Sequence, residues 1–66
     1  MILYFNNEAL TITPGSTLLE VLMTLDLPSQ PYAVAINLNF VPKSQYALTH
    51  LAASDRIDLV VATQGG

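Results

Sequence analysis

Only one stretch of this sequence has the pattern of a helix long enough to cover a hydrophobic core. It begins with TLLE at positions 17–20, where the Thr17 hydroxyl can accept from a free backbone N–H while Glu20 reaches back to the Thr17 amide. Pro28 predicts that the helix ends near residues 25–27. The apolar residues of this segment recur at helical spacing and share one face: Leu18, Val21, Leu22 and Leu25. We interpret that face as core, and the rest of the core must come from strands.

The segments on either side of the helix have the composition and alternation of strands. Residues 1–5 are apolar and stop at Asn6-Asn7, a turn signal, and residues 9–13 alternate cleanly, so a β-hairpin is predicted. Three further strands are predicted at 33–36, 40–41 and 57–62. A turn at 37–39 connects the first two of them, and one helical turn is predicted within 44–51.

This order of elements predicts an α+β fold with one main helix packed across one face of a mixed sheet of four to five strands. If the first and last strands lie side by side at the centre of the sheet, they are parallel, because the helix acts as the crossover between them. We expect a single domain over residues 1–66, with a flexible C-terminal tail at 63–66.

Composition excludes several ways of stabilising or using so short a chain. The 66 residues contain no cysteine and one histidine, so neither a disulfide framework nor a zinc cluster is expected, and the core must rest on the 52% of hydrophobic residues. Only two residues are Lys or Arg, too few to neutralise several phosphates, which argues against nucleic-acid binding and against an anionic membrane surface. No apolar run approaches the length of a membrane span, and a basic secretory segment is lacking, so we expect a cytoplasmic domain.

Six short segments are informative by their order and spacing: the hairpin at 1–13, TLLEVL at 17–22, AIN at 35–37, VPK at 41–43, DRI at 55–57 and the final Gly65-Gly66. Together they resemble a ubiquitin-like β-grasp domain and, more narrowly, the ThiS family of sulfur-carrier proteins of thiamine biosynthesis. The chain departs from the family pattern at Lys43, where Arg is more frequent, at Ser54, where Gly often precedes the Asp, and at Thr63, where the approach to the tail is less apolar.

The resemblance implies a carrier rather than an enzyme. In such a carrier the Gly66 carboxylate is adenylated by a ThiF-like adenylyltransferase that uses ATP, and is then converted to a thiocarboxylate. The sulfur comes from a donor enzyme, a cysteine desulfurase or a sulfurtransferase, and goes to a thiazole synthase. The domain itself binds no cofactor. Two alternatives stay open: a carrier of the molybdopterin-synthase type, which is usually longer, and a ubiquitin-like modifier or interaction module.

The residues of the chain agree with a carrier role. It has no Cys nucleophile, no Gly-rich phosphate loop and no paired carboxylates near a plausible pocket. His50 has no carboxylate partner near it in sequence, so we expect this histidine to be structural or solvated. Gly65 and Gly66 present bare backbone and can take φ values closed to other residues, which suits a narrow channel in a partner. Thr63 and Gln64 are predicted to enter the partner's active site with them.

Strand parity predicts where such a partner docks. Asp58 must reach water, so Ile57, Leu59 and Val61 point to the core, and Val60 and Ala62 point outward. In the first strand, Leu3 and Phe5 point inward if Tyr4 keeps its hydroxyl wet. The outward residues of the two strands are predicted to form one apolar docking patch beside the tail: Ile2, Tyr4, Val60 and Ala62.

Overall fold

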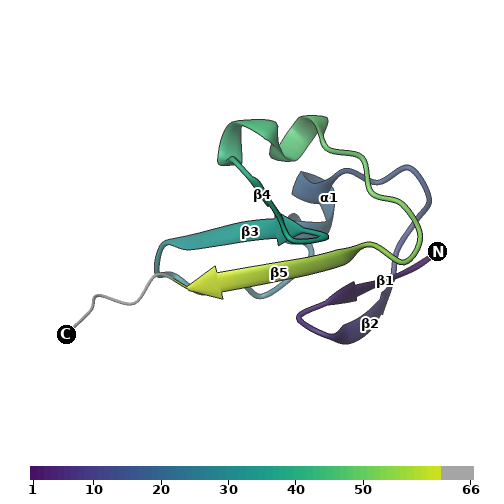
Figure 1. Cartoon of the computed structure of the whole chain (residues 1–66), viewed down its shortest axis with the longest axis horizontal. Coiled ribbons are helices and arrows are strands. Elements are labelled where there is room, and N and C mark those ends of the chain that lie inside the picture. The colour runs from purple at the N-terminus through teal and green to yellow at the C-terminus, as the bar shows by residue number, and fades with distance from the viewer. Residues whose placement is uncertain (62–66) are drawn as a thin grey trace.

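Five strands form one mixed sheet in the order β2-β1-β5-β3-β4, and the helical segments lie together on one of its faces (Figure 1). The computed structural model describes residues 1–61. β1 and β5 are parallel, whereas each of the other neighbouring pairs is antiparallel. The elements are β1 (Ile2–Phe5), β2 (Glu8–Thr11), α1 (Leu18–Met23), β3 (Tyr32–Ile36), β4 (Asn39–Val41), the 3₁₀ helix η1 (Lys43–Leu48) and β5 (Arg56–Val61). The predicted α+β architecture, with its parallel central pair, is confirmed.

The capping box predicted at the start of α1 is present. Thr17 Oγ1 accepts from the backbone N–H of Glu20 at 3.2 Å, and the Glu20 carboxylate accepts from the backbone N–H of Thr17 at 2.9 Å. The helix ends at Met23, earlier than the predicted 25–27, because the Thr24 hydroxyl donates to the Val21 carbonyl at 2.7 Å and closes the last turn. Leu25 still packs against the core from the segment that follows.

The hydrophobic core contains side chains from every layer of the fold. Four of its side chains are completely buried, one each from β1, α1, β3 and β5: Leu3, Leu18, Val34 and Ile57. Val21 and Leu22 complete the helical contribution, and Tyr46 of η1 and Leu51 close the side of the core beyond the helix. The inward parity predicted for the first and last strands is confirmed, and no polar or charged residue of the described part is buried.

Two turns of two residues connect the antiparallel pairs at the edges of the sheet. Asn6 and Asn7 join β1 to β2 with φ of 49° and 69°, and Asn37 and Leu38 join β3 to β4 with φ of 51° and 71°. Positive φ at both positions matches the twist of the flanking strands, and Asn adopts it more readily than other non-glycine residues. Leu38 lacks this tolerance, and its side chain is 84% exposed, so no packing offsets its backbone strain.

Replacing Leu38 by Gly is therefore expected to stabilise the domain, by about 1 kcal/mol, because glycine adopts positive φ without the clash of a Cβ. The measurement is the free energy of unfolding in urea. Leu38→Ala is the matched control, since it removes the exposed side chain but keeps the Cβ. An equal gain in both variants would assign the effect to the apolar side chain and not to the backbone.

The capping box also predicts a pH dependence of stability. Hydrogen bonds from Thr17, the backbone N–H first and the hydroxyl second, hold the pKa of Glu20 below its ordinary value of 4.5. A depressed folded-state pKa means that this contribution to stability is fully present above the unfolded pKa and is lost as pH falls through the folded pKa. Wild type should therefore exceed Glu20→Gln in urea midpoint near neutral pH, and the difference should shrink towards about pH 3. A difference that stays constant over this range would contradict the role of the carboxylate charge.

Candidate functional site

β5 is the strand that leads to the predicted reactive tail. It lies between β1 and β3 at the centre of the sheet, and its last residue, Val61, pairs with Tyr32, the first residue of β3. The described part of β5 therefore ends where β3 begins, at the tip of the β5 arrow that is farthest from the label N (Figure 1). The predicted site residues that follow lie outside the described residues: Ala62, Thr63, Gln64, Gly65 and Gly66.

The first half of β5 is held from both sides by the asparagines of the two turns. The backbone N–H of Asn6 donates to the Ile57 carbonyl at 2.8 Å, and the side-chain oxygen Asn6 Oδ1 accepts from the backbone N–H of Leu59 at 2.9 Å. On the other side, the Asn37 N–H donates to the Arg56 carbonyl at 2.8 Å, and Asn37 Oδ1 accepts from the Arg56 N–H at 3.0 Å. Sequence reasoning recognised these residues as turn formers and missed that they fix β5.

Beyond Leu59, the strand partner of β5 is β3 alone. β1 pairs with β5 only through Tyr4 and Phe5, opposite Arg56 and Ile57, whereas β3 pairs with β5 as far as Val61. The end of β5 therefore has a rigid neighbour on one side and none from β1 on the other. This arrangement leaves the point where the tail begins open to a partner on the β1 side.

The outward orientation predicted for three of the docking residues is confirmed. Val60 is 63% exposed, Ile2 is 51% exposed and Tyr4 is 41% exposed, whereas Leu3 and Ile57 are buried. All three outward residues lie on the sheet face that the helices leave uncovered, because the parity of β1 and β5 places them opposite to the core.

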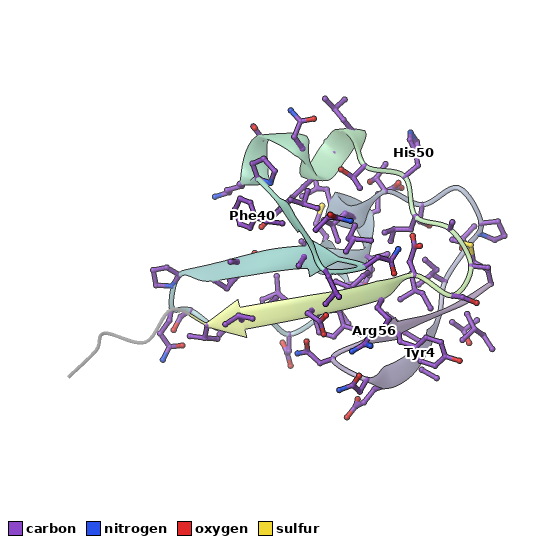
Figure 2. All side chains as sticks on the ribbon, viewed as in Figure 1. Tyr4, Phe40, His50 and Arg56 are labelled. Atoms are coloured by element: carbon purple, nitrogen blue, oxygen red, sulfur yellow. The ribbon has the colours of Figure 1, made fainter. Side chains whose placement is uncertain are left out.

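The prediction that these residues form one continuous patch is wrong. Tyr4 pairs with Arg56, and Figure 2 shows the two side chains at the same end of the sheet. Val60 lies four residues further along β5, about 13 Å at strand spacing. Arg56 and Asp58 occupy the same face between them, by parity. The reason is the shortness of β1, which ends at Asn6 before it can run beside the second half of β5.

The apolar neighbours of Val60 come from β3 and β4 instead. Val60 pairs with Ala33, and Ala35 of the same outward set pairs with Phe40, which is strongly exposed. We call Val60, Ala33, Ala35 and Phe40 the tail-side face. Phe40 was not predicted as a docking residue. The signal available in the sequence was strand alternation, which places Phe40 and Val41 on opposite faces of the sheet.

Phe40, which is labelled in Figure 2, also lines a small hollow at the β4 edge of the domain. The hollow has a volume of about 320 Å³ and is lined by Pro31, Tyr32, Phe40, Lys43 and Tyr46. Burial raises the pKa of Tyr46 above its ordinary value. Because Tyr32 is the register partner of Val61, this hollow borders the point where β5 ends.

The only histidine of the sequence lies next to the residues that precede α1. His50 pairs with Thr17 in an isolated bridge, and its Nδ1 lies 3.2 Å from the Gly15 carbonyl oxygen. Among residues 1–61, no group of three or more His, Cys, Asp and Glu side chains gathers to hold a metal ion. Within the same residues, no helix is long and apolar enough to cross a membrane.

The sheet order, the parallel central pair and the single covering helix define a ubiquitin-like β-grasp domain. The fold matches the crystal structure of thiamine biosynthesis protein ThiS from Geobacter metallireducens with a TM-score of 0.87, at 19% sequence identity and over 100% of both chains. The sequence is 35% identical to sulfur carrier protein ThiS of Escherichia coli, over 100% of both chains. The model of the ThiS family matches residues 3–66. The chain belongs to the ThiS family.

Proposed function

We propose that this chain is a sulfur carrier of thiamine biosynthesis and that its Gly66 carboxylate becomes the thiocarboxylate that carries the sulfur. The observation that carries this proposal is the family match, which extends to residue 66 and so includes both terminal glycines. The similarity to sulfur carrier protein ThiS of Escherichia coli over 100% of that chain supports the same reading of the C-terminal residues.

The chemistry requires that the carboxylate be activated before sulfur can be added. A carboxylate is a poor electrophile, because its negative charge is delocalised and repels nucleophiles. Attack of a carboxylate oxygen on the α-phosphate of ATP releases pyrophosphate and gives an acyl-adenylate. The outer sulfur of a persulfide on the donor enzyme then displaces AMP at the acyl carbon and gives an acyl disulfide. A second cysteine thiolate of that enzyme attacks the inner sulfur, which releases the thiocarboxylate and leaves a disulfide on the enzyme. Adenylation and the displacement of AMP both need a site that positions the acyl carbon and excludes water.

The chain supplies the substrate end for these steps, and we assign the catalysis to partner proteins. It has no cysteine to act as a nucleophile. A ThiF-like adenylyltransferase would bind the ATP, a cysteine desulfurase or sulfurtransferase would provide the sulfur, and a thiazole synthase would receive it. Gly66 is the fifth residue after Val61, and five residues of chain reach at most about 17 Å, so each partner must bind close to the end of β5.

The tail-side face is the surface that we propose for this contact. Val60 and Phe40 are exposed apolar side chains, and the alanines between them leave room for a partner's side chains to approach the backbone. Ile2 and Tyr4, at the far end of β5, form a separate apolar area beyond Arg56 and Asp58. The proposed docking surface therefore keeps Val60 from the sequence prediction and replaces Ile2 and Tyr4 by residues of β3 and β4.

Intact-mass spectrometry tests the carrier role directly. After incubation with the cognate adenylyltransferase, ATP and the sulfur donor, the chain should gain about 16 Da, because one carboxylate oxygen is replaced by sulfur. A chain lacking Gly65 and Gly66 is the control and should gain nothing. No mass gain with enzymes proven active on another carrier would overturn the proposal, and a link to a lysine instead would identify a modifier.

Val60→Asp tests the docking surface. Burying a valine side chain contributes about 1.5 kcal/mol or more, so the affinity for the adenylyltransferase should fall about tenfold or more, as measured by isothermal titration calorimetry. The fold should survive, since this side chain is largely exposed. Tyr4→Asp is the matched control at the far end of β5, and it should change the affinity less. If Tyr4→Asp weakened binding more than Val60→Asp, the partner would dock near Tyr4 and not on the tail-side face, which would contradict the proposed docking surface.

A further inference from the structure

β2 is an edge strand of the sheet, and half of its backbone groups have no strand beside them. Met1 and Ile12 exchange both possible hydrogen bonds, since the Ile12 N–H donates to the Met1 carbonyl at 2.9 Å and the Met1 amino group donates to the Ile12 carbonyl at 2.8 Å. Bonded and non-bonded pairs alternate along an antiparallel ladder. The next pair, Ile2 with Thr11, and the pair Tyr4 with Ala9 are therefore non-bonded.

The backbone of β1 verifies this alternation. The Tyr4 N–H donates to the Asp55 carbonyl at 2.9 Å and the Ile2 carbonyl accepts from the Ser54 N–H at 2.8 Å, so both residues direct their polar groups away from β2. Their partners on β2 must point the opposite way. The N–H and C=O groups of Ala9 and Thr11 thus face the open edge, where no strand of the described part pairs with them.

The other edge of the sheet, β4, has fewer backbone groups available for pairing with an added strand. β4 has three residues, and the same alternation leaves only Phe40 with backbone groups directed outward. Pro42 follows directly and has no N–H to donate. Of the two edges, β2 is the one on which an added strand could form a ladder of several hydrogen bonds.

A groove lies at the end of this edge, between α1 and the segment that runs from Thr11 to Ser16. Its volume is about 740 Å³, larger than the hollow beside β4. On the strand side the groove is lined by Thr11, Ile12, Thr13 and Ser16. On the helix side it is lined by Glu20, Val21, Met23 and Thr24. Val21 is buried and Ile12 half-buried at the base, whereas Met23 is 76% exposed. A strand added to β2 that continues past Thr11 would direct alternate side chains into this groove, where the apolar lining residues are Ile12, Val21 and Met23.

The charge of the groove favours a basic occupant. Glu20 is the one charged residue in its lining, and Thr17 holds that carboxylate in place at 2.9 Å and 3.1 Å. The two cationic side chains of the chain lie elsewhere, since Arg56 contacts Asn7 Oδ1 at 3.2 Å, by the turn at the opposite end of β2, and Lys43 lines the hollow beside β4. The Met1 amino group is engaged with the Ile12 carbonyl.

We propose that the β2 edge is a binding site for an extended peptide segment of a partner protein. The segment adds to the sheet as a sixth strand by hydrogen bonds to Ala9 and Thr11, inserts an apolar side chain between Ile12 and Met23, and places a Lys or Arg beside Glu20. This mode of recognition obtains affinity from the main chain and specificity from alternate side chains. It is independent of the tail, so its test does not depend on the sulfur-carrier role.

The test is a titration of the ¹⁵N-labelled full chain with the blocked peptide acetyl-Lys-Val-Leu-Val-Lys-amide, followed by NMR. The amide signals of Ala9 and Thr11 should shift and exchange with solvent more slowly, and the Met23 methyl signal should shift. The acidic peptide acetyl-Glu-Val-Leu-Val-Glu-amide should bind more weakly, because it meets Glu20. Glu20→Gln, which retains a capping side chain, should reduce the difference between the two peptides.

Thr11→Pro provides the matched backbone variant. It removes an N–H that points to the open edge without removing a bond of the β1–β2 ladder, and proline is tolerated on edge strands. Its affinity for the basic peptide should fall about tenfold, whereas Thr11→Val, which keeps the N–H, should lose less affinity. If the proline variant does not fold, Met23→Ser, on the exposed rim, should weaken binding instead.

Three results would overturn the proposal. One is equal binding of the peptide by wild type, Thr11→Pro and Met23→Ser. Another is a set of shifts centred on Phe40 or on the open face of the sheet instead of on β2. The third is a concentration-dependent dimer, detected by sedimentation, that Thr11→Pro abolishes while no peptide binds, since the occupant of the edge would then be a second copy of this chain.

Discussion

The parallel pairing of β1 with β5 is the constraint on which the rest of the structure depends. It joins the first and last elements of the chain, and it is short, with Tyr4 and Phe5 as its register positions on β1. Asn6 extends it by two hydrogen bonds, one from its backbone and one to its side chain, just where β1 turns away. Asn37 does the same from the β3 side. Two turn residues with positive φ thus fix the strand that leads to the proposed reactive end.

The features that sequence alone could predict are those set by neighbouring residues. The capping box depends on three residues of spacing between Thr17 and Glu20, and the inward set of β5 depends on alternation, so both were predicted correctly. The continuity of the docking patch was predicted wrongly, because it depends on how far β1 runs beside β5. Alternation along one strand shows which face a residue is on, but not which residue of the neighbouring strand lies beside it. The second function of Asn6 and Asn37 was missed for the same reason, since their partners on β5 are distant in sequence.

The surface of the domain separates into regions with different chemistry. The tail-side face is apolar and lies where β5 ends, whereas the groove at β2 lies on the other edge of the sheet, is bordered by unpaired backbone and contains Glu20. The intervening part of the open face contains Arg56 and Asp58, which are hydrophilic and interrupt the apolar area. A partner confined to the tail-side face would leave the β2 edge free, since the two surfaces lie at different edges of the sheet.

The small size of the domain limits how its partners can share the reactive end. A standard interface covers about 800 Å² on each side, which is about a sixth of the 4541 Å² that this chain exposes. The surface would accommodate several such interfaces if they could be placed anywhere. The enzymes proposed to act on Gly66 must all lie within about 17 Å of Val61, because that is the reach of five residues. Their footprints overlap there, so the carrier must leave one enzyme before it meets the next. Sulfur transfer in this scheme is sequential, and a small tail-side face that gives weak, quickly dissociating complexes suits it better than an extensive one.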